Sequence, residues 1–319
     1  MPLTRIVFFG TPEFASGTLR ALAQDARMEV VGVVTAPDKP AGRGQTLRAS
    51  HVSNTAHELG LSVLKPVKLK DPEFLRALAD LQADVFAVVA FRMLPKEVWN
   101  MPPLGTFNVH ASLLPDYRGA APIQWAVANG DTQTGVTTFL LNDRIDEGAI
   151  LLQEHLSVAP NETIAALYER LMHAGAALAV KTVRDLWNGN SHPIPQNIGE
   201  NARLAPKIFA DFAELERLST LEDIHHRIRA CDSFPGASLA LSEAPEKRIK
   251  VYGSKIIKLY NTEDYNKRIE LIISDTYIHL AQGENLLSIQ EIQWPGKRKM
   301  DSSDFLRGFR KRGKFALKQ

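Results

Sequence analysis

Two polar side chains that could do proton or oxyanion chemistry end a predicted strand in the stretch TFNVHAS. Asn108 and His110 are two positions apart, so they point to one side of an extended strand while Val109 points to the other. Asn donates through its amide, and His both donates and exchanges a proton near neutral pH. Together they suit an oxygen that gains negative charge during a reaction. The alternative is a hydrogen-bonded pair that only caps a turn.

A carboxylate further along the chain favours the catalytic interpretation. Asp146 lies in the short segment RIDEG between two predicted strands. Beside His110, it would orient the imidazole ring and take part in proton transfer. Asp is also a common turn residue, so the sequence alone leaves a meeting with His110 open.

The residues before this stretch alternate between strand and helix patterns. Apolar strands are predicted at 5–10, 28–36 and 83–91, and helices at about 12–24, 51–60 and 71–81. Such alternation predicts an α/β fold with a mostly parallel, doubly wound sheet. Ligands bind to open sheets of this kind at the carboxyl ends of the strands, which is where Asn108 and His110 stand.

The later part of the chain has a different pattern. A long helix is predicted over about 163–188, followed by a segment rich in Pro, Gly and Asn. We interpret 189–206 as an interdomain linker, which leaves domains at 1–188 and 207–319. In the second domain a helix pattern at 218–232 precedes short, closely spaced strands, which indicate a small β-barrel.

Composition predicts a soluble globular protein, with 45% hydrophobic and 23% charged residues. Cys231 is the only cysteine, so no intramolecular disulfide is possible and a reducing compartment is expected. The first residues lack the apolar run of a signal peptide, and no run approaches the roughly 20 residues of a membrane helix. We therefore expect a cytoplasmic protein. No apolar stripe calls for a dimer, so we expect a monomer.

The net charge of +2 conceals an asymmetry. From Lys207 onward there are 20 Lys and Arg against 16 Asp and Glu, so this part carries +4 and the part before it −2. Residues 297–319 hold nine basic and two acidic residues, with three phenylalanines among them. Basic surface with interleaved aromatic residues is typical of nucleic-acid binding, although a solvated terminus could have the same composition.

Two cofactor classes are not favoured. There is no CxxC, and His225 and His226 are adjacent rather than spaced i,i+4 on a helix, so no metal site is predicted. The turn after the first strand lacks GxGxxG, and Pro12 removes an amide that a phosphate would use. AGRG (41–44) is no Walker motif. It is either a loop whose Arg43 reaches a substrate or an ordinary surface turn.

Four segments of the sequence together carry a resemblance to a known family. They are GTPEFA (10–15), PAGRG (40–44), NVHASLLPDYRGAAPIQWA (108–126) and the Asp-Glu-Gly turn at 146–148. In order and spacing the chain resembles the folate-dependent formyltransferases over essentially its full length, most closely the members that act on a charged tRNA. The resemblance implies a Rossmann-like catalytic domain, a linker, and a smaller C-terminal domain similar to an OB-fold, with a basic surface toward tRNA.

The resemblance also implies an activity. The formyl group of 10-formyltetrahydrofolate would pass, without a metal, to the α-amino group of methionine on initiator tRNA, for translation initiation. Asn108 and His110 would stabilise the oxyanion of the tetrahedral intermediate. Asp146 would hold His110 and help to move the amine's proton. The remaining implied contacts are with folate, from Ser112, Leu113, Leu114, Pro115, Phe91 and Arg92, and with tRNA, from Arg43 and Lys207.

Two other functions stay open. A sister formyltransferase for a small amine, such as glycinamide ribonucleotide or an amino-sugar nucleotide, would share the Asn–His–Asp set without needing a basic second domain. A catalytically inactive RNA-binding protein would not need the set. AFRML (90–94) departs from the small Gly-containing turn expected after the fourth strand, so Arg92 could change the folate wall.

Overall fold

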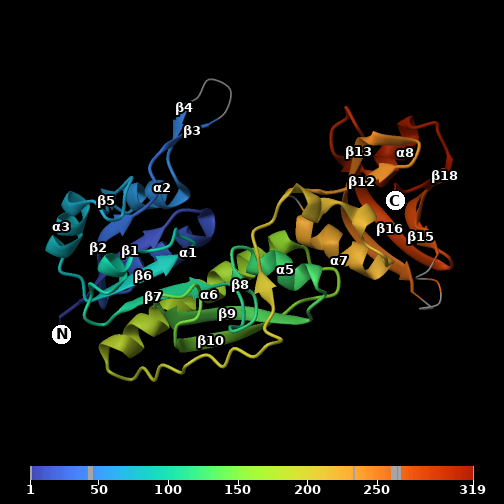
Figure 1. Cartoon of the computed structure of the whole chain (residues 1–319). Helices are drawn as coiled ribbons and strands as arrows, with labels where there is room; N and C mark the ends of the chain where they lie inside the picture. The colour runs from blue at the N-terminus through green and yellow to red at the C-terminus, as the bar shows by residue number, and fades with distance from the viewer. Residues whose placement is uncertain (1, 42–45, 233, 260–263, 265–266, 319) are drawn as a thin grey trace. The chain divides into compact units, whose positions relative to one another are not determined.

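The computed structural model describes residues 2–41, 46–232, 234–259, 264 and 267–318. The chain forms two compact units, coloured along the chain in Figure 1. Unit 1 comprises the chain up to Pro122, Gln133–Ser157 and Tyr168–Pro206, and unit 2 comprises Ile123–Thr132, Val158–Leu167 and the chain from Lys207 onward. No helix among the described residues has both the length and the apolar character to cross a membrane.

A seven-stranded sheet forms the centre of unit 1, in the order β10-β9-β7-β6-β1-β2-β5. Its strands are β1 (Thr4–Gly10), β2 (Met28–Val34), β5 (Val63–Leu64), β6 (Val85–Val89), β7 (Thr106–His110), β9 (Gln133–Leu140) and β10 (Ile150–Ser157). Five neighbouring strands of the sheet, β7, β6, β1, β2 and β5, are parallel to one another. The last two strands, β9 and β10, are antiparallel to their neighbours. The predicted Rossmann-like, mostly parallel sheet is confirmed.

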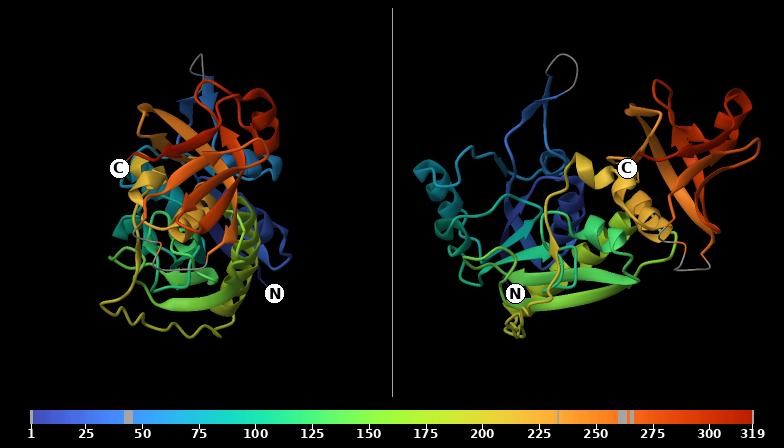
Figure 2. Two further views of the ribbon diagram at one scale, coloured as in Figure 1. Left: turned by 90° about the vertical axis from the view of Figure 1, so that its right-hand side faces the viewer. Right: turned by 45° about the vertical axis from the view of Figure 1, so that its right-hand side comes forward.

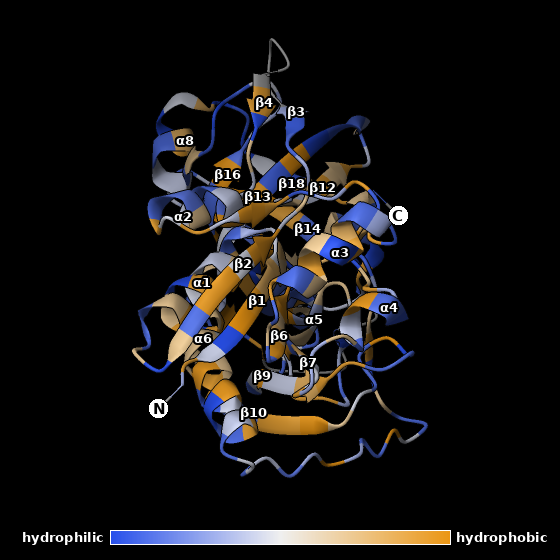
Figure 3. Ribbon diagram, turned by 90° about the vertical axis from the view of Figure 1, so that its left-hand side faces the viewer, coloured by the Kyte–Doolittle hydropathy of each residue, from blue (hydrophilic) through white to orange (hydrophobic). Residues whose placement is uncertain are grey.

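Helices cover both faces of this sheet, because its central strands are apolar on both sides. They are α1 (Glu13–Gln24), α2 (His51–Glu58), α3 (Pro72–Asp80), the short α4 (Lys96–Trp99) and α6 (Ile164–Trp187). Phe9 of β1 packs with Phe74 and Leu78 of α3 on one side. On the other, Gly17 of α1 lies against Met172 of α6. Figure 2 shows these layers from two sides, and Figure 3 shows that β1, β2 and β6 are mostly hydrophobic.

Two helices of unit 1 begin at side chains that cap them. Ser50 accepts a hydrogen bond from the Ser53 amide at the start of α2. Asp71 accepts from the amide of Glu73 at the start of α3, with Pro72 as the first helical residue. Caps of this kind contribute about 1 kcal/mol each to stability, so the sequence determines where these helices begin.

A hairpin projects from unit 1 between β2 and α2. It consists of β3 (Lys39–Ala41) and β4 (Thr46–Arg48), which pair antiparallel. Figure 1 shows these strands extending away from the central sheet. The segment predicted as a loop is therefore flanked by paired strands. Arg43, the predicted tRNA contact, lies outside the described residues.

Unit 2 contains a curled antiparallel sheet in the order β12-β13-β16-β15-β14-β18, with β17 paired to β16. Its strands are β12 (Ala237–Leu241), β13 (Ala244–Lys258), β14 (Glu270–Ile273), β15 (Ile278–Gln282), β16 (Asn285–Gln293), β17 (Met300–Asp301) and β18 (Gly313–Ala316). A bridge between Leu241 and Leu317 joins its two edges. The predicted OB-like barrel is therefore confirmed. The helices α7 (Leu221–Cys231) and α8 (Ser302–Gly308) accompany it.

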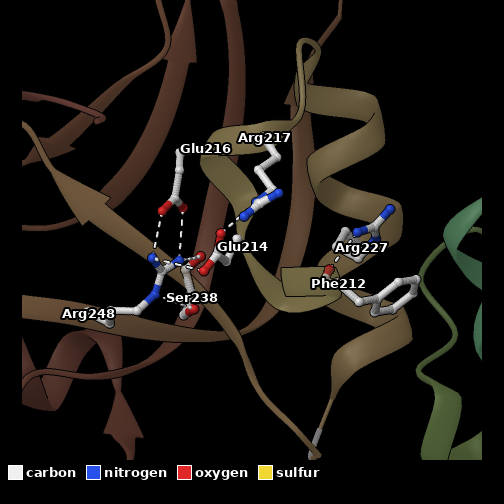
Figure 4. A network of polar contacts seen from close by, with 7 residues as sticks. All are labelled: Phe212, Glu214, Glu216, Arg217, Arg227, Ser238 and Arg248. Carbon is white, nitrogen blue, oxygen red and sulfur yellow. Dashed lines mark hydrogen bonds and ion pairs between the residues drawn. The ribbon is translucent and has the colours of Figure 1, made fainter. Parts of the chain in front are cut away.

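An arginine network holds the segment before α7 against this sheet (Figure 4). Arg248 of β13 donates to both carboxylate oxygens of Glu216, at 2.7 and 3.0 Å, and to the Ser238 hydroxyl at 2.9 Å. Glu216 lies in the turn η2 (Leu215–Arg217). Two parallel bonds from one guanidinium give the contact a defined geometry.

Candidate active site

His110 ends β7 and is buried, with only 6% of its surface exposed. Its Nε2 lies 2.8 Å from the carbonyl oxygen of Tyr117. Because a carbonyl can only accept, Nε2 carries the hydrogen. The ring therefore has a fixed direction, and Nδ1 is the nitrogen left to act on another group.

Asp146 lies beside that nitrogen. Its Oδ2 is 3.8 Å from Nδ1 of His110, and the same oxygen accepts the Gly119 amide at 2.9 Å. Asp146 has a φ of +55°, in the left-handed region, which Asp adopts more readily than most residues. The structure thus joins the two residues whose meeting the sequence left open.

The turn around Asp146 is built from tight backbone contacts. A Cβ on Gly148 would lie 1.6 Å from the carbonyl oxygen of Leu140, so this position accepts only glycine. Gln196 donates from Nε2 to the carbonyl oxygens of Asp146 and Gly148, at 2.9 and 2.8 Å. The carboxylate is therefore held by a rigid turn.

Asn108 lies on the same side of β7 as His110, as the strand alternation predicts. It pairs in register with Val88 of β6 and Phe139 of β9. Val109 faces the opposite way, since a Cβ on Gly175 of α6 would lie 3.1 Å from its Cγ1. Asn108 is partly exposed, and its side-chain amide has no hydrogen bond to another described residue. The amide is available to an incoming oxygen.

The predicted folate segment 112–115 is held rigidly by polar contacts. Ser112 donates from Oγ to the Asp116 carbonyl at 2.7 Å and accepts at its own carbonyl from Thr137 at 2.7 Å. Gln153 donates to the Leu114 carbonyl at 2.9 Å. Leu114 is buried and precedes a cis peptide bond, whereas Leu113 and Pro115 are partly exposed.

The other predicted folate contacts follow β6. Phe91 is partly exposed and meets Phe9 edge to face, with ring centroids 5.8 Å apart. Arg92 is exposed and donates to the carbonyl oxygens of Pro66 and Val67, at 2.5 and 2.8 Å. Its guanidinium therefore binds a neighbouring loop of unit 1.

Lys207, the predicted tRNA contact that the structure does describe, is the first residue of the longest segment of unit 2. It is exposed, and its Nζ lies 5.6 Å from the ring centroid of Phe209. Phe209 is itself 65% exposed. A cation beside an exposed aromatic ring is a surface that suits nucleic acid.

Unit 2 also contains two neighbouring histidines. His225 is buried between the Ser254 hydroxyl, 2.8 Å from Nδ1, and the Pro160 carbonyl, 3.1 Å from Nε2. Burial lowers the pKa of His225 to about 4. The described part of the chain contains no group of three His, Cys, Asp or Glu side chains that could hold a metal ion.

Three groups that hold the site were not predicted. Tyr117 and Gly119 act through main-chain atoms, whose direction no side-chain pattern reveals. Gln196 falls in the segment interpreted as a linker. The one sign of these contacts in the sequence is the glycine at position 119. The structure gives it a φ of +123°, a conformation that favours glycine.

The chain matches two family models, "Formyl transferase" over residues 4–183 and "Formyl transferase, C-terminal domain" over residues 207–310. It belongs to the formyl transferase family. Two relatives are named methionyl-tRNA formyltransferase. The one from Parabacteroides distasonis is 44% identical over 98% of each chain, and the one from Bacteroides thetaiotaomicron is 42% identical over 96% of each.

Two solved structures are similar in fold. An N-formyltransferase from Helicobacter canadensis, in complex with folinic acid and dTDP-3-aminofucose, has a TM-score of 0.64 at 17% identity and covers 90% of this formyl transferase and 99% of that chain. HypX from Aquifex aeolicus, in complex with tetrahydrofolic acid, has a TM-score of 0.58 at 17% identity, covering 99% of this chain and 51% of that one.

Proposed function

We propose that this formyl transferase moves the formyl group of 10-formyltetrahydrofolate onto the α-amino group of methionine carried by initiator tRNA. The product would be N-formylmethionyl-tRNA for translation initiation. The observation that carries the proposal is the pairing of His110 and Asp146 at the carboxyl end of β7. The name shared by relatives that match nearly the whole chain supports the acceptor.

The reaction begins when the neutral amine attacks the formyl carbon. A C–N bond forms, and the formyl oxygen becomes an oxyanion in a tetrahedral intermediate. Asn108 donates to that oxygen through its free amide, and His110 donates through Nδ1 when the ring carries a second proton. One such donor typically contributes about 3 kcal/mol to the transition state.

Asp146 has two tasks in this scheme. Its carboxylate, 3.8 Å from Nδ1, would hold His110 in place beside the reacting atoms. It also accepts the proton that the attacking amine must lose, directly or through a water molecule. The C–N bond to the folate then breaks, and the folate nitrogen takes up a proton to leave as tetrahydrofolate.

The substrates would bind on either side of this pair. Segment 112–115, together with Phe91 and Arg92, would line the folate site, and Arg43 and Lys207 would contact tRNA. The excess of four positive charges from Lys207 onward supports a polyanionic acceptor. We assign catalysis to residues 1–188, a linker to 189–206 and tRNA binding to 207–319, in a cytoplasmic monomer.

The test is formyl transfer from 10-formyltetrahydrofolate to methionyl initiator tRNA at two salt concentrations. We expect transfer that weakens steeply with salt, because binding through phosphates releases counterions. An amino-sugar nucleotide and glycinamide ribonucleotide serve as competing acceptors. Transfer to either small amine, with none to tRNA from folded protein, would replace the tRNA acceptor. Binding of tRNA without transfer would indicate an inactive RNA-binding protein.

A further inference from the structure

The segment that follows α6 is part of unit 1 and pairs with other strands of that unit. Ile194 exchanges two backbone hydrogen bonds with Ile150, each 2.8 Å long. Ten residues later, β11 (Leu204–Ala205) pairs in parallel with β8 (Arg118–Gly119). We call residues 194–205 the strap. Its two pairings lie next to the turn that contains Asp146 and to the loop that follows His110.

Arg203 makes the densest contacts of the strap. Its Nε and Nη2 donate to Oδ2 of Asp116, at 3.0 and 2.7 Å, and its backbone amide donates to Oδ1 at 3.1 Å. One arginine therefore occupies both oxygens of this carboxylate. A lysine has no fork of donors and could not reproduce the arrangement.

The same arginine holds Tyr117 from two directions. The Tyr117 amide donates to the carbonyl oxygen of Arg203 at 2.6 Å, and the guanidinium carbon lies 4.4 Å from the centre of the tyrosine ring. Tyr117 is buried and has a φ of +59°, which is unfavourable for a non-glycine residue. Surrounding contacts must therefore keep it in this conformation, and Arg203 supplies several of them.

The position of Tyr117 in turn determines the direction of the His110 ring. The Tyr117 carbonyl is the group that binds Nε2 of His110 and so directs Nδ1 toward Asp146. We propose that Arg203 is a positioning residue for His110, acting through Asp116 and Tyr117. This inference rests on the proposed function, in which His110 stabilises the oxyanion. Gln196 of the strap holds the Asp146 turn in the same way.

Steady-state formyl transfer to methionyl initiator tRNA tests the proposal, with wild type, Arg203→Ala, Arg203→Lys, Asp116→Asn and the Arg203→Ala/Asp116→Asn double variant. We expect kcat to fall about tenfold to a hundredfold in Arg203→Ala, because small misplacements of a catalytic group are costly. KM for both substrates should stay within about threefold. Arg203→Lys should not restore kcat, and the double variant should lose no more than the worse single variant.

The matched control is Arg20→Ala, which removes a surface ion pair with Glu58 between α1 and α2. Its kcat should equal that of wild type. Urea unfolding of every variant shows whether it is folded, and Arg203→Lys carries the test if Arg203→Ala does not fold. For each variant, kcat is compared with the change in the free energy of unfolding. Arg20→Ala gives the same two measurements for a surface ion pair outside the site.

Two results would overturn the proposal. One is a kcat of Arg203→Ala within about twofold of wild type. The other is a raised KM for tRNA that Arg203→Lys restores, which would make Arg203 a phosphate contact. Wild type without transfer, or His110→Ala with full activity, would instead refute the proposed function, so the two failures are distinguishable.

Discussion

Nδ1 of His110 and Oδ2 of Asp146 are 3.8 Å apart, beyond hydrogen-bond distance but within ion-pair distance when the imidazole is protonated. The Gly119 amide, 2.9 Å from the same oxygen, fixes the carboxylate from its other side. The negative charge is therefore positioned by the backbone and does not depend on contact with the imidazole.

Replacing Asp146 by Asn tests the need for this charge. The side-chain oxygen of Asn can still accept the Gly119 amide, so the turn should fold. We expect kcat to fall about 10²–10³-fold, because the negative charge beside His110 is removed and the attacking amine loses its proton acceptor. The control is Asp143→Asn, an exposed position in the same connection. Wild-type kcat in Asp146→Asn would exclude a catalytic carboxylate here.

Gly119→Ala tests the contact between the strap and the loop after His110. A Cβ at this position would lie 2.6 Å from the carbonyl oxygen of Ala205, at a φ of +123°. We expect the free energy of unfolding to fall by about 2 kcal/mol or more, from strain and the clash together.

Gly60→Ala is the comparison for that experiment. Gly60 has a φ of +68° with nothing within 4 Å of the added Cβ, so this variant has the strain without the clash and should lose only about 1 kcal/mol. The measurement is urea unfolding followed by circular dichroism. Equal losses in the two variants would show that the strap contact is loose.

Stability should depend on pH through His225. Its pKa is lowered by burial from 6.5 to about 4, so as the pH falls below 6.5 the unfolded chain binds a proton that the folded chain does not. The contribution of neutral His225 to the free energy of unfolding is fully present above pH 6.5. It is lost progressively down to about pH 4, by about 3 kcal/mol in all. Urea midpoints of wild type across this range measure the slope.

His225→Gln should flatten that slope. Gln can still donate to the Pro160 carbonyl, and it does not titrate. His226 and His279, whose pKa values burial also lowers, contribute to the slope in every variant. Exposed His192→Gln is the control and should keep the wild-type slope. The same slope in His225→Gln and wild type would show that His225 does not cause the pH dependence.

The tRNA contacts can be tested by salt dependence. Arg43→Ala and Lys207→Ala should each raise KM for methionyl initiator tRNA and reduce the slope of log affinity against log salt by about 1. The KM for 10-formyltetrahydrofolate should stay unchanged. Lys181→Ala, which removes a charge paired with Asp185 on α6, is the control. Unchanged salt slopes would remove both residues from the tRNA surface.

Much of the fold could be predicted from local patterns. The apolar runs at β1, β2 and β6 and the capped helices α2 and α3 are each specified within a few neighbouring residues. The pair β8–β11 could not be predicted, because each strand has two residues and they are far apart in sequence. The helix α5 (Pro122–Ala128) was also missed, since the resemblance described that stretch only as a motif.

The arrangement of the candidate side chains could be predicted from strand geometry. Asn108 and His110 follow from the two-residue period of a strand. The part played by Tyr117 was not predictable, because its carbonyl acts and its backbone conformation depends on Arg203, 86 positions later in the chain. A contact between residues so far apart in the sequence produces no local pattern from which it could be predicted.

The most direct test of the central claim is the kcat for formyl transfer to methionyl initiator tRNA in wild type, His110→Ala and His155→Ala. His155 is an exposed histidine on β10 and serves as the control. We predict a kcat at least about 10²-fold lower in His110→Ala, with His155→Ala equal to wild type. A folded His110→Ala protein with wild-type kcat would contradict the account.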